Sequence, residues 1–295
     1  MPMIGISLYD LQKVYGDRRA LELARECGAD AVDFFLKAEP YAEGSVYAQG
    51  EDAVAAYYGE LGAYARSLGL IVSQTHGRCK SFIGEAEFDR ITVEKCRLDC
   101  LATAALGAPA CVVHSVSTCS VGPEAEPQYM RELNHSMWMQ LLPFAKHYGV
   151  KLAAETFGDA PKYGCVDFFG DFEEFLTACK AVEDSEYGDF FTVCVDTGHS
   201  NKAMRFGNPD PAEVIRRLGN RITLLHLNDN DTLTDQHKMP LSGSIDWEAV
   251  LGALEEVGYR GVYNMELNLK RYGEVLMADH AAFAIKVLRE ALQKD

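Results

Sequence analysis

The stretch ITLLHLNDNDTLTDQH, residues 222–237, changes character at His226, where a run of apolar residues gives way to acids, amides and imidazoles. A short run of apolar and β-branched residues, bounded by turn residues, indicates a buried strand. A polar cluster therefore stands just beyond the end of a strand. Its members are Asn228, Asp229, Asn230, Asp231, Asp235 and His237.

Seven further runs of this kind are spread along the chain. With the first, they cover residues 3–8, 30–36, 70–76, 110–115, 150–156, 190–196, 222–227 and 261–267. Amphipathic helical stretches separate them, and several of these stretches end in Gly, which often terminates a helix. Eight strands alternating with helices over about 250 residues or slightly more is the pattern of a (β/α)8 TIM barrel. We therefore expect an α/β fold with a single TIM-barrel domain over residues 1–295. The strand count, and the lack of GxGxxG after the first strand, disfavour a doubly wound sheet.

Composition restricts the class of protein and its partners. The chain has 295 residues, 48% of them hydrophobic and 24% charged, which is typical of a soluble globular protein. No apolar run approaches the roughly 20 residues of a membrane-spanning helix, so we expect no membrane partner. The N-terminus MPMIGISLYD lacks the basic segment of a signal peptide and indicates a first strand. Nine scattered cysteines without CxxC spacing indicate reduced thiols and a cytoplasmic location. The net charge of −16 disfavours a nucleic-acid partner.

Six consecutive strands end in a residue that can bind a metal ion or transfer a proton. The residues are His76, His114, Glu155, Asp196, His226 and Glu266, at intervals of 38, 41, 41, 30 and 40 residues. Each interval is one strand–helix unit, and the C-terminal ends of barrel strands meet on the face where active sites form. A single His or Asp in such a place is explained by packing or by helix capping. Six in succession predict a functional site.

The last four of these residues form a mixed set of oxygen and nitrogen donors. Such a set suits one divalent ion (Mn, Co, Zn or Mg), with positions left for substrate or water. Three carboxylates packed together without a cation would raise at least one pKa sharply. We therefore predict that Glu155, Asp196, His226 and Glu266 bind one divalent metal ion. A network of carboxylates and histidines without a metal is the alternative.

Further polar residues are expected around the same face. His199, three residues after Asp196, points into the site as a metal ligand or a substrate hydrogen-bond donor. The loops also offer cations that could meet a substrate phosphate, although exposed lysines and arginines are more often simply solvated. These cations are Arg78, Lys80, Lys162 and Lys238. The residues predicted to bind substrate are His199, His76, His114 and Lys238.

Four segments, AAETF, CVDTGHS, LHLNDND with the later DQH, and NMEL, resemble in this order the motifs of the sugar phosphate isomerases and epimerases, which are xylose-isomerase-like TIM barrels. The resemblance runs from His76 to Glu266. It implies one divalent ion on the four predicted ligands, and proton removal and return by Glu155 and Glu266. It also implies that His199 binds a substrate oxygen. The implied substrate is a small sugar, a keto-polyol or a sugar phosphate. Epimerisation and aldose–ketose isomerisation both stay open, and so does assembly into a homo-oligomer.

A second resemblance lies within the same superfamily. Endonuclease IV uses three zinc ions, and its ligand pattern can be placed on His76, His114, Glu155, Asp196, His199, His226, Asp235, His237 and Glu266. This resemblance implies that Asp235 and His237 are candidate ligands of an additional ion. The net charge and the lack of a basic, aromatic DNA-binding set in the early loops weigh against a nuclease. Leu241 and Ser242 depart from the Gly-Glu-Gly found in many relatives. Two alternatives to the isomerase or epimerase stay open. One is a multi-zinc phosphodiesterase with three Zn ions, and the other is a non-catalytic barrel that binds a sugar or a metal.

Overall fold

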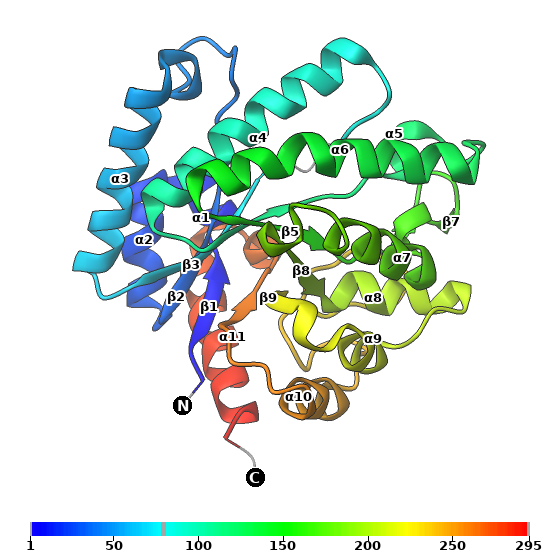
Figure 1. Ribbon diagram of the computed structural model, residues 1–295. Helices are drawn as coiled ribbons and strands as arrows, with labels where there is room; N and C mark the ends of the chain where they lie inside the picture. Colours follow the sequence, from blue (N-terminus) through cyan, green and yellow to red (C-terminus); the bar gives the residue numbers. More distant parts are fainter. Residues whose placement is uncertain (1, 78–80, 294–295) are drawn as a thin grey trace.

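The computed structural model describes residues 2–77 and 81–293 and contains a sheet of eight parallel strands (Figure 1). The order of the strands in the sheet is β10-β1-β2-β3-β4-β5-β8-β9. Their bounds are β1 (Ile4–Ser7), β2 (Ala31–Phe35), β3 (Ile71–His76), β4 (Ala110–Val113), β5 (Lys151–Glu155), β8 (Phe191–Asp196), β9 (Ile222–His226) and β10 (Tyr263–Met265). All eight predicted strands are present, and the prediction of a (β/α)8 barrel is confirmed.

The two ends of the sheet meet at β9 and β10, so the barrel is nearly closed. A parallel bridge joins Leu227 to Met265. The Leu227 amide donates to the Asn264 carbonyl at 2.8 Å, and the Glu266 amide donates to the Leu227 carbonyl at 3.2 Å. The regular part of β10 is shorter than predicted because this pairing consists of an isolated bridge.

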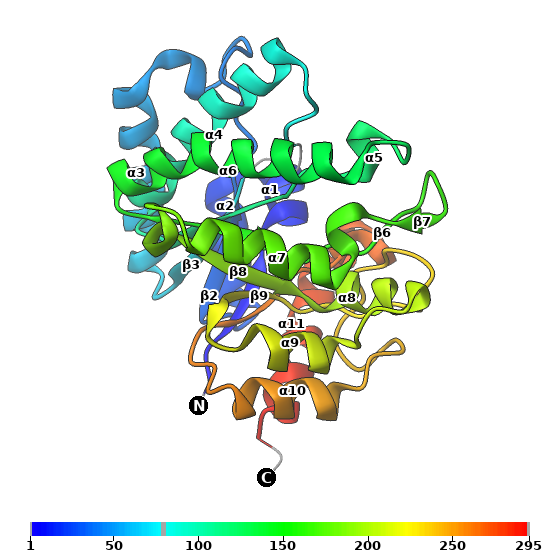
Figure 2. The ribbon, with the colours of Figure 1, turned by 45° about the vertical axis from the view of Figure 1, so that its right-hand side comes forward.

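Helices surround the barrel and connect successive strands (Figures 1 and 2). They are α1 (Tyr9–Tyr15), α2 (Asp17–Glu26), α3 (Glu51–Ser67), α4 (Ala86–Leu106), α5 (Thr118–Val121), α6 (Pro127–Tyr148), α7 (Phe172–Glu183), α8 (Thr197–Ala203), α9 (Pro211–Leu218), α10 (Trp247–Glu256) and α11 (Met277–Ala291). The Asp246 side chain accepts a hydrogen bond from the Ala249 amide and caps α10. A two-stranded antiparallel pair, β6 (Asp159–Ala160) and β7 (Cys165–Val166), lies outside the barrel (Figure 2).

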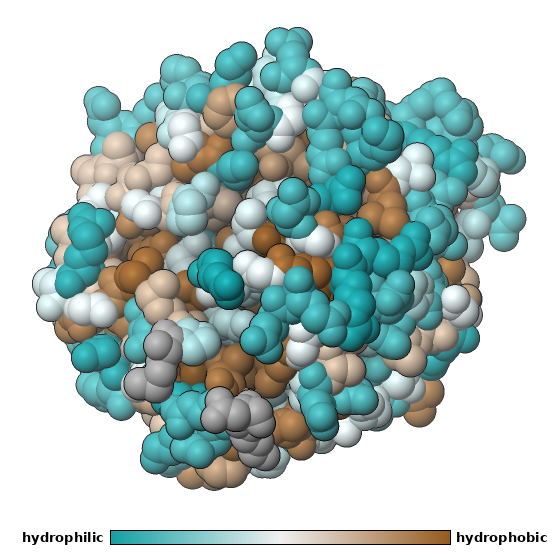
Figure 3. All heavy atoms as spheres, turned by 60° about the horizontal axis from the view of Figure 1, so that its bottom comes forward, coloured by the Kyte–Doolittle hydropathy of each residue, from teal (hydrophilic) through white to brown (hydrophobic). Residues whose placement is uncertain are grey.

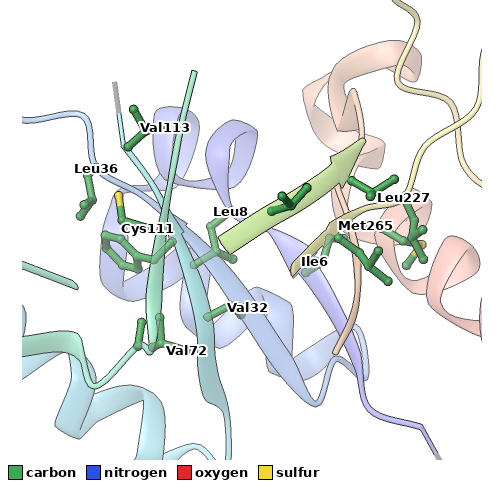
Figure 4. Close-up of a cluster of buried hydrophobic side chains, with 14 of the residues drawn as sticks. Ile6, Leu8, Val32, Leu36, Val72, Cys111, Val113, Leu227 and Met265 are labelled. Atoms are coloured by element: carbon green, nitrogen blue, oxygen red, sulfur yellow. The ribbon is translucent and has the colours of Figure 1, made fainter. Parts of the chain in front are cut away.

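Two apolar clusters mark the outside and the inside of the barrel. The larger cluster lies between strands and helices and includes Ile6, Val32 and Met265 (Figure 4). The smaller cluster consists of Ala110, Val112, Ala153, Cys194 and Leu224. Side chains alternate across a strand, so residues two positions later on these strands face the same interior. Those residues are His114, Glu155, Asp196 and His226.

The polarity of the surface, the state of the cysteines and the length of the apolar helices bear on the predictions made from composition. Figure 3 shows one face of the molecule, on which hydrophilic residues prevail along the upper and right-hand parts and apolar patches lie among them toward the centre and left. The described cysteines are unpaired, and most of them are buried, although Cys119 is exposed and Cys165 half-buried. Within residues 2–77 and 81–293, no helix is long and apolar enough to cross a membrane.

Candidate metal centre

Four inward-facing side chains meet where β5, β8, β9 and β10 end. One potential ligand atom from each of Glu155, Asp196, His226 and Glu266 lies within 4.8 Å of the other three. The Nδ1 atom of His226 is 2.8 Å from Oε1 of Glu155 and 3.4 Å from Oε2 of Glu266. The fold thus brings together side chains that are 111 residues apart in the sequence, from Glu155 to Glu266.

The donor set and its burial fit a divalent cation. Glu155, Asp196 and His226 are at most 1% exposed. The Oε2 atom of Glu155 has no hydrogen bond within the described part of the chain, although His114 Nε2 lies 2.8 Å away in a geometry that forms none. A buried carboxylate oxygen is costly unless it is paired, and a cation satisfies it. Oxygen and imidazole donors together suit Mn, Co, Zn or Mg.

Histidines control the ionisation of the two glutamates. Burial by itself would raise the pKa of Glu155, but His226 and His114 outweigh burial and hold this pKa well below its ordinary value. The pKa of Glu266 is also lowered, since His226 and His237 outweigh the effect of burial. Burial dominates at Asp196 and raises its pKa. A metal ion bound here would displace protons from the histidines, because only neutral imidazole is a ligand.

Three histidines around the site share one orientation. In each of them Nδ1 lies 3.0–3.1 Å from a main-chain carbonyl oxygen, which only accepts hydrogen bonds, so Nδ1 carries the proton. The pairs are His76 with Gly77, His199 with Thr156 and His237 with Glu266. Their Nε2 atoms face carboxylates of the site. The shortest such distances are 3.7 Å from His76 to Glu155, 3.6 Å from His199 to Asp235 and 3.4 Å from His237 to Asp235.

A second group of potential ligands adjoins the first. Single ligand atoms of Asp196, His199 and His237 lie within 4.8 Å of one another. Asp235 lies beside this group, and its Oδ1 atom is 3.7 Å from Nζ of Lys202. Lys202 is 3% exposed, and its Nζ is 2.8 Å from Oδ1 of Asp159. A fixed ammonium group in this position opposes the binding of a further divalent cation at Asp235.

The first acids after β9 organise the loop that follows. Asp229 accepts hydrogen bonds from the indole of Trp247 at 2.8 Å and from the amides of Gly243 and Ile245 at 2.8 and 3.2 Å. Asn228 instead positions one of the candidate ligands, because its Nδ2 donates to Oδ2 of Asp196 at 2.8 Å. These contacts explain why the chain places so many polar residues directly after His226.

The same loop contains unusual backbone conformations. Among the described residues, the non-glycine residues with positive φ are Thr232, His237 and Leu241, with values of 68°, 43° and 68°. Such conformations are uncommon outside glycine and tend to occur at functional sites. Leu241, where the sequence departs from the family pattern, is 56% exposed. His237, one of the three residues with positive φ, has Nε2 3.4 Å from Oδ2 of Asp235.

Aromatic rings border the site on two sides. The ring of Phe157 lies between His114 and His199, with centroid distances of 5.1 and 5.8 Å. Phe35 packs against His76 with a centroid distance of 5.4 Å. The two aromatic rings therefore contact three histidines around the four candidate ligands.

Sequence reasoning missed several residues of the site. They are Asp33, Phe157, Lys202 and Asn228. Asp33 had a usable signal, because it is an acid inside the apolar strand 30–36. Lys202 follows His199 by three residues on one helix and therefore lies on the same helical face. Phe157 had no signal that distinguishes it from a core residue.

The structure describes two of the four loop cations that could meet a substrate phosphate. Arg78 and Lys80 lie outside the described residues. Lys162 lies over the ring of Tyr163, with Nζ 4.9 Å from the centroid. The main chain of Lys238 exchanges two hydrogen bonds of 2.9 Å with Asp229, and no contact among the described residues joins its ammonium group to the site. Substrate binding by Lys238 stays a prediction.

A nearly closed barrel with acids and histidines at the C-terminal ends of its strands defines the structural class. The sequence matches the xylose isomerase-like TIM barrel family over residues 21–291, and the chain belongs to this family. It is similar to the uncharacterized proteins y4fM of Sinorhizobium fredii and MJ1311 of Methanocaldococcus jannaschii, at 27% identity over 199 residues and 30% over 148. The matches cover 65% and 49% of this chain. They span 58% and 47% of the relatives, about half of their length.

Solved structures share the fold over nearly the whole chain. They include a D-tagatose 3-epimerase-like protein (23% identity, TM-score 0.71), the IOLI protein with a bound zinc atom (18%, 0.73) and an AP endonuclease, family 2, from Brucella melitensis (15%, 0.70). The alignments cover 99%, 98% and 97% of this chain and 97%, 98% and 99% of those chains. At these identities the likeness establishes a common fold, and the named activities belong to those proteins.

Proposed function

We propose that this protein is a divalent-metal-dependent isomerase or epimerase that acts on a small sugar, a keto-polyol or a sugar phosphate. The observation that carries the proposal is that the buried Glu155 and the half-buried Glu266 approach one point together with Asp196 and His226. The fold is shared with a sugar epimerase-like protein and with a protein that binds zinc, which supports both parts of the proposal.

Moving a proton next to a carbonyl group requires a base at the carbon and stabilisation of negative charge on the oxygen. A divalent ion held by the four residues would supply that stabilisation as a Lewis acid, worth several kcal/mol. The lowered pKa values of Glu155 and Glu266 keep both carboxylates ionised near neutral pH, so either can accept a proton. Positioned carboxylates typically accelerate such a step by about 10²–10⁴-fold.

One glutamate removes the proton and the other returns a proton. Return to the opposite face of the same carbon gives an epimer, and return to the neighbouring carbon interconverts an aldose and a ketose. His76, His114, His199 and Lys238 bind substrate oxygens in this proposal. The exposed fractions of the His114 and His199 side chains, 16% and 15%, are consistent with such a role, because part of each side chain is accessible to solvent.

A multi-zinc phosphodiesterase is the second candidate. The observation in its favour is the adjoining ligand group of Asp196, His199 and His237. Two features favour the isomerase or epimerase instead. The buried cation of Lys202 lies beside Asp235, and the net charge of −16 repels a nucleic-acid backbone.

Deuterium uptake from heavy water tests the proposed reaction. Metal-replete protein is incubated with a panel of ketoses and aldoses, with and without phosphate groups, and the products are identified by NMR. We expect deuterium at the carbon beside the carbonyl group, together with an epimer or isomer of one substrate. A sugar that binds but shows neither deuterium uptake nor a product would contradict the proposal and favour a non-catalytic barrel.

A further inference from the structure

Asp33 is a buried carboxylate whose partner lies on a strand that is not its neighbour. It lies on β2 and is 0% exposed, and its Oδ2 atom is 3.2 Å from Nε2 of His226 on β9. The strands β2 and β9 are not neighbours in the sheet. The Oδ1 atom of Asp33 has no hydrogen-bond partner among the described residues. A fully buried carboxylate in this state costs free energy, so its presence needs an explanation other than stability.

The orientation of His226 supplies that explanation. His76, His199 and His237 each bond a main-chain carbonyl through Nδ1 and turn Nε2 toward the site. His226 is reversed, because its Nδ1 faces Glu155 at 2.8 Å and its Nε2 points away from the ligand cluster toward Asp33. A ring turned this way must carry its proton on Nε2 if Nδ1 is to bind a metal ion. An ionised carboxylate accepts the hydrogen bond of this N–H group more strongly than a neutral main-chain carbonyl does.

We propose that Asp33 is a positioning residue that holds His226 with its proton on Nε2 and its Nδ1 lone pair directed at the metal centre. The proposal rests on the metal centre of the proposed function. A carboxylate that accepts the outer N–H of a ligating histidine fixes the tautomer and the ring orientation, and it increases the basicity of the ligating nitrogen. Asp33 therefore acts on metal affinity through His226, without contact to the substrate.

Metal affinity of the variants Asp33→Asn and Asp33→Ala tests this role. Metal-free protein is titrated with Zn²⁺ by calorimetry at constant pH. We expect the Kd to rise about 10–100-fold in Asp33→Ala, as is typical when such a partner is lost. Asp33→Asn keeps an acceptor without the charge and should lie between Asp33→Ala and the natural protein. Asp33→Ala also leaves the buried Nε2 of His226 without its partner and should lower the thermal stability of the metal-free protein, so the Kd is the deciding quantity.

Asp167→Asn is the matched control. Asp167 is also 0% exposed, but it accepts hydrogen bonds from the Ser117 hydroxyl at 2.6 Å and from the Thr118 amide at 2.9 Å, outside the ligand cluster. This variant should lose stability and keep the Kd of the natural protein. If Asp33→Ala behaved in the same way, its role would be structural and the proposal would be overturned.

The proton on His226 gives a second readout. In zinc-loaded protein with ¹⁵N-labelled histidine, NMR should find the His226 proton on Nε2, and a proton on Nδ1 would overturn the proposal. Failure of the proposed function is a different result. If the natural protein bound no Zn²⁺, the metal centre and this proposal would both fall. Binding by the natural protein with an unchanged Kd in both Asp33 variants would overturn this proposal alone.

Discussion

Replacing Glu155 or Glu266 with Gln is expected to abolish turnover, with a fall in kcat/KM of at least about 10²–10⁴-fold. Gln has nearly the shape of Glu but cannot accept a proton or supply a carboxylate to a metal ion. Glu155 is 1% exposed and lies 2.8 Å from ring nitrogens of both His226 and His114. Removing its negative charge therefore changes the electrostatic environment of both histidines. The barrel itself should persist, because its core lies outside this cluster.

The measurement is product formation and deuterium uptake from heavy water, with circular dichroism as the check on folding. Glu256→Gln is the matched control. Glu256 lies on α10, with a side chain that is 57% exposed and paired with Arg216, and its variant should keep full activity. Full activity in folded Glu155→Gln or Glu266→Gln would remove both residues from the proposed roles.

Removal of the metal ion with a chelator is expected to stop turnover and to lower the thermal stability. An ion present at about 1,000 times its Kd stabilises the native state by about 4.1 kcal/mol. For a chain of this size the loss corresponds to a fall in Tm of roughly 8 °C. The physical reason is that Glu155, Asp196 and Glu266 would be left without the cation that offsets their mutual repulsion.

Thermal unfolding with and without chelator, followed by return of the ion, measures this effect. The ligand variant His226→Asn should show no fall in Tm when chelator is added, because it has little metal to lose. Undiminished turnover after complete removal of metal would exclude the ion from the reaction.

The fold could be predicted because two independent patterns in the sequence agree. Apolar runs located the eight strands, and His, Asp or Glu recurred at the strand ends with the spacing of one strand–helix unit. The alternation of side chains then placed Glu155 two residues beyond Ala153, and His226 two residues beyond Leu224, on the inside of the barrel. The meeting of the four predicted ligands follows from this geometry.

The sequence could not predict which side chains contact each other across the barrel, or which hydrogen bonds shape the loop after β9. The contact between Asp33 and His226 joins strands that are not neighbours, so no local pattern contains it. The orientation of each imidazole depends on which carbonyl or carboxylate lies behind it. The loop after β9 takes its shape from Asp229, whose partners lie up to 18 residues further along the chain.

Metal content per chain is the first measurement to make, by mass spectrometry on protein purified without chelator. The four-ligand centre predicts about one divalent ion per chain. Close to three zinc ions per chain would contradict it, since Asp235, His237 and the early histidines would then be ligands. The phosphodiesterase would in that case become the better-supported function.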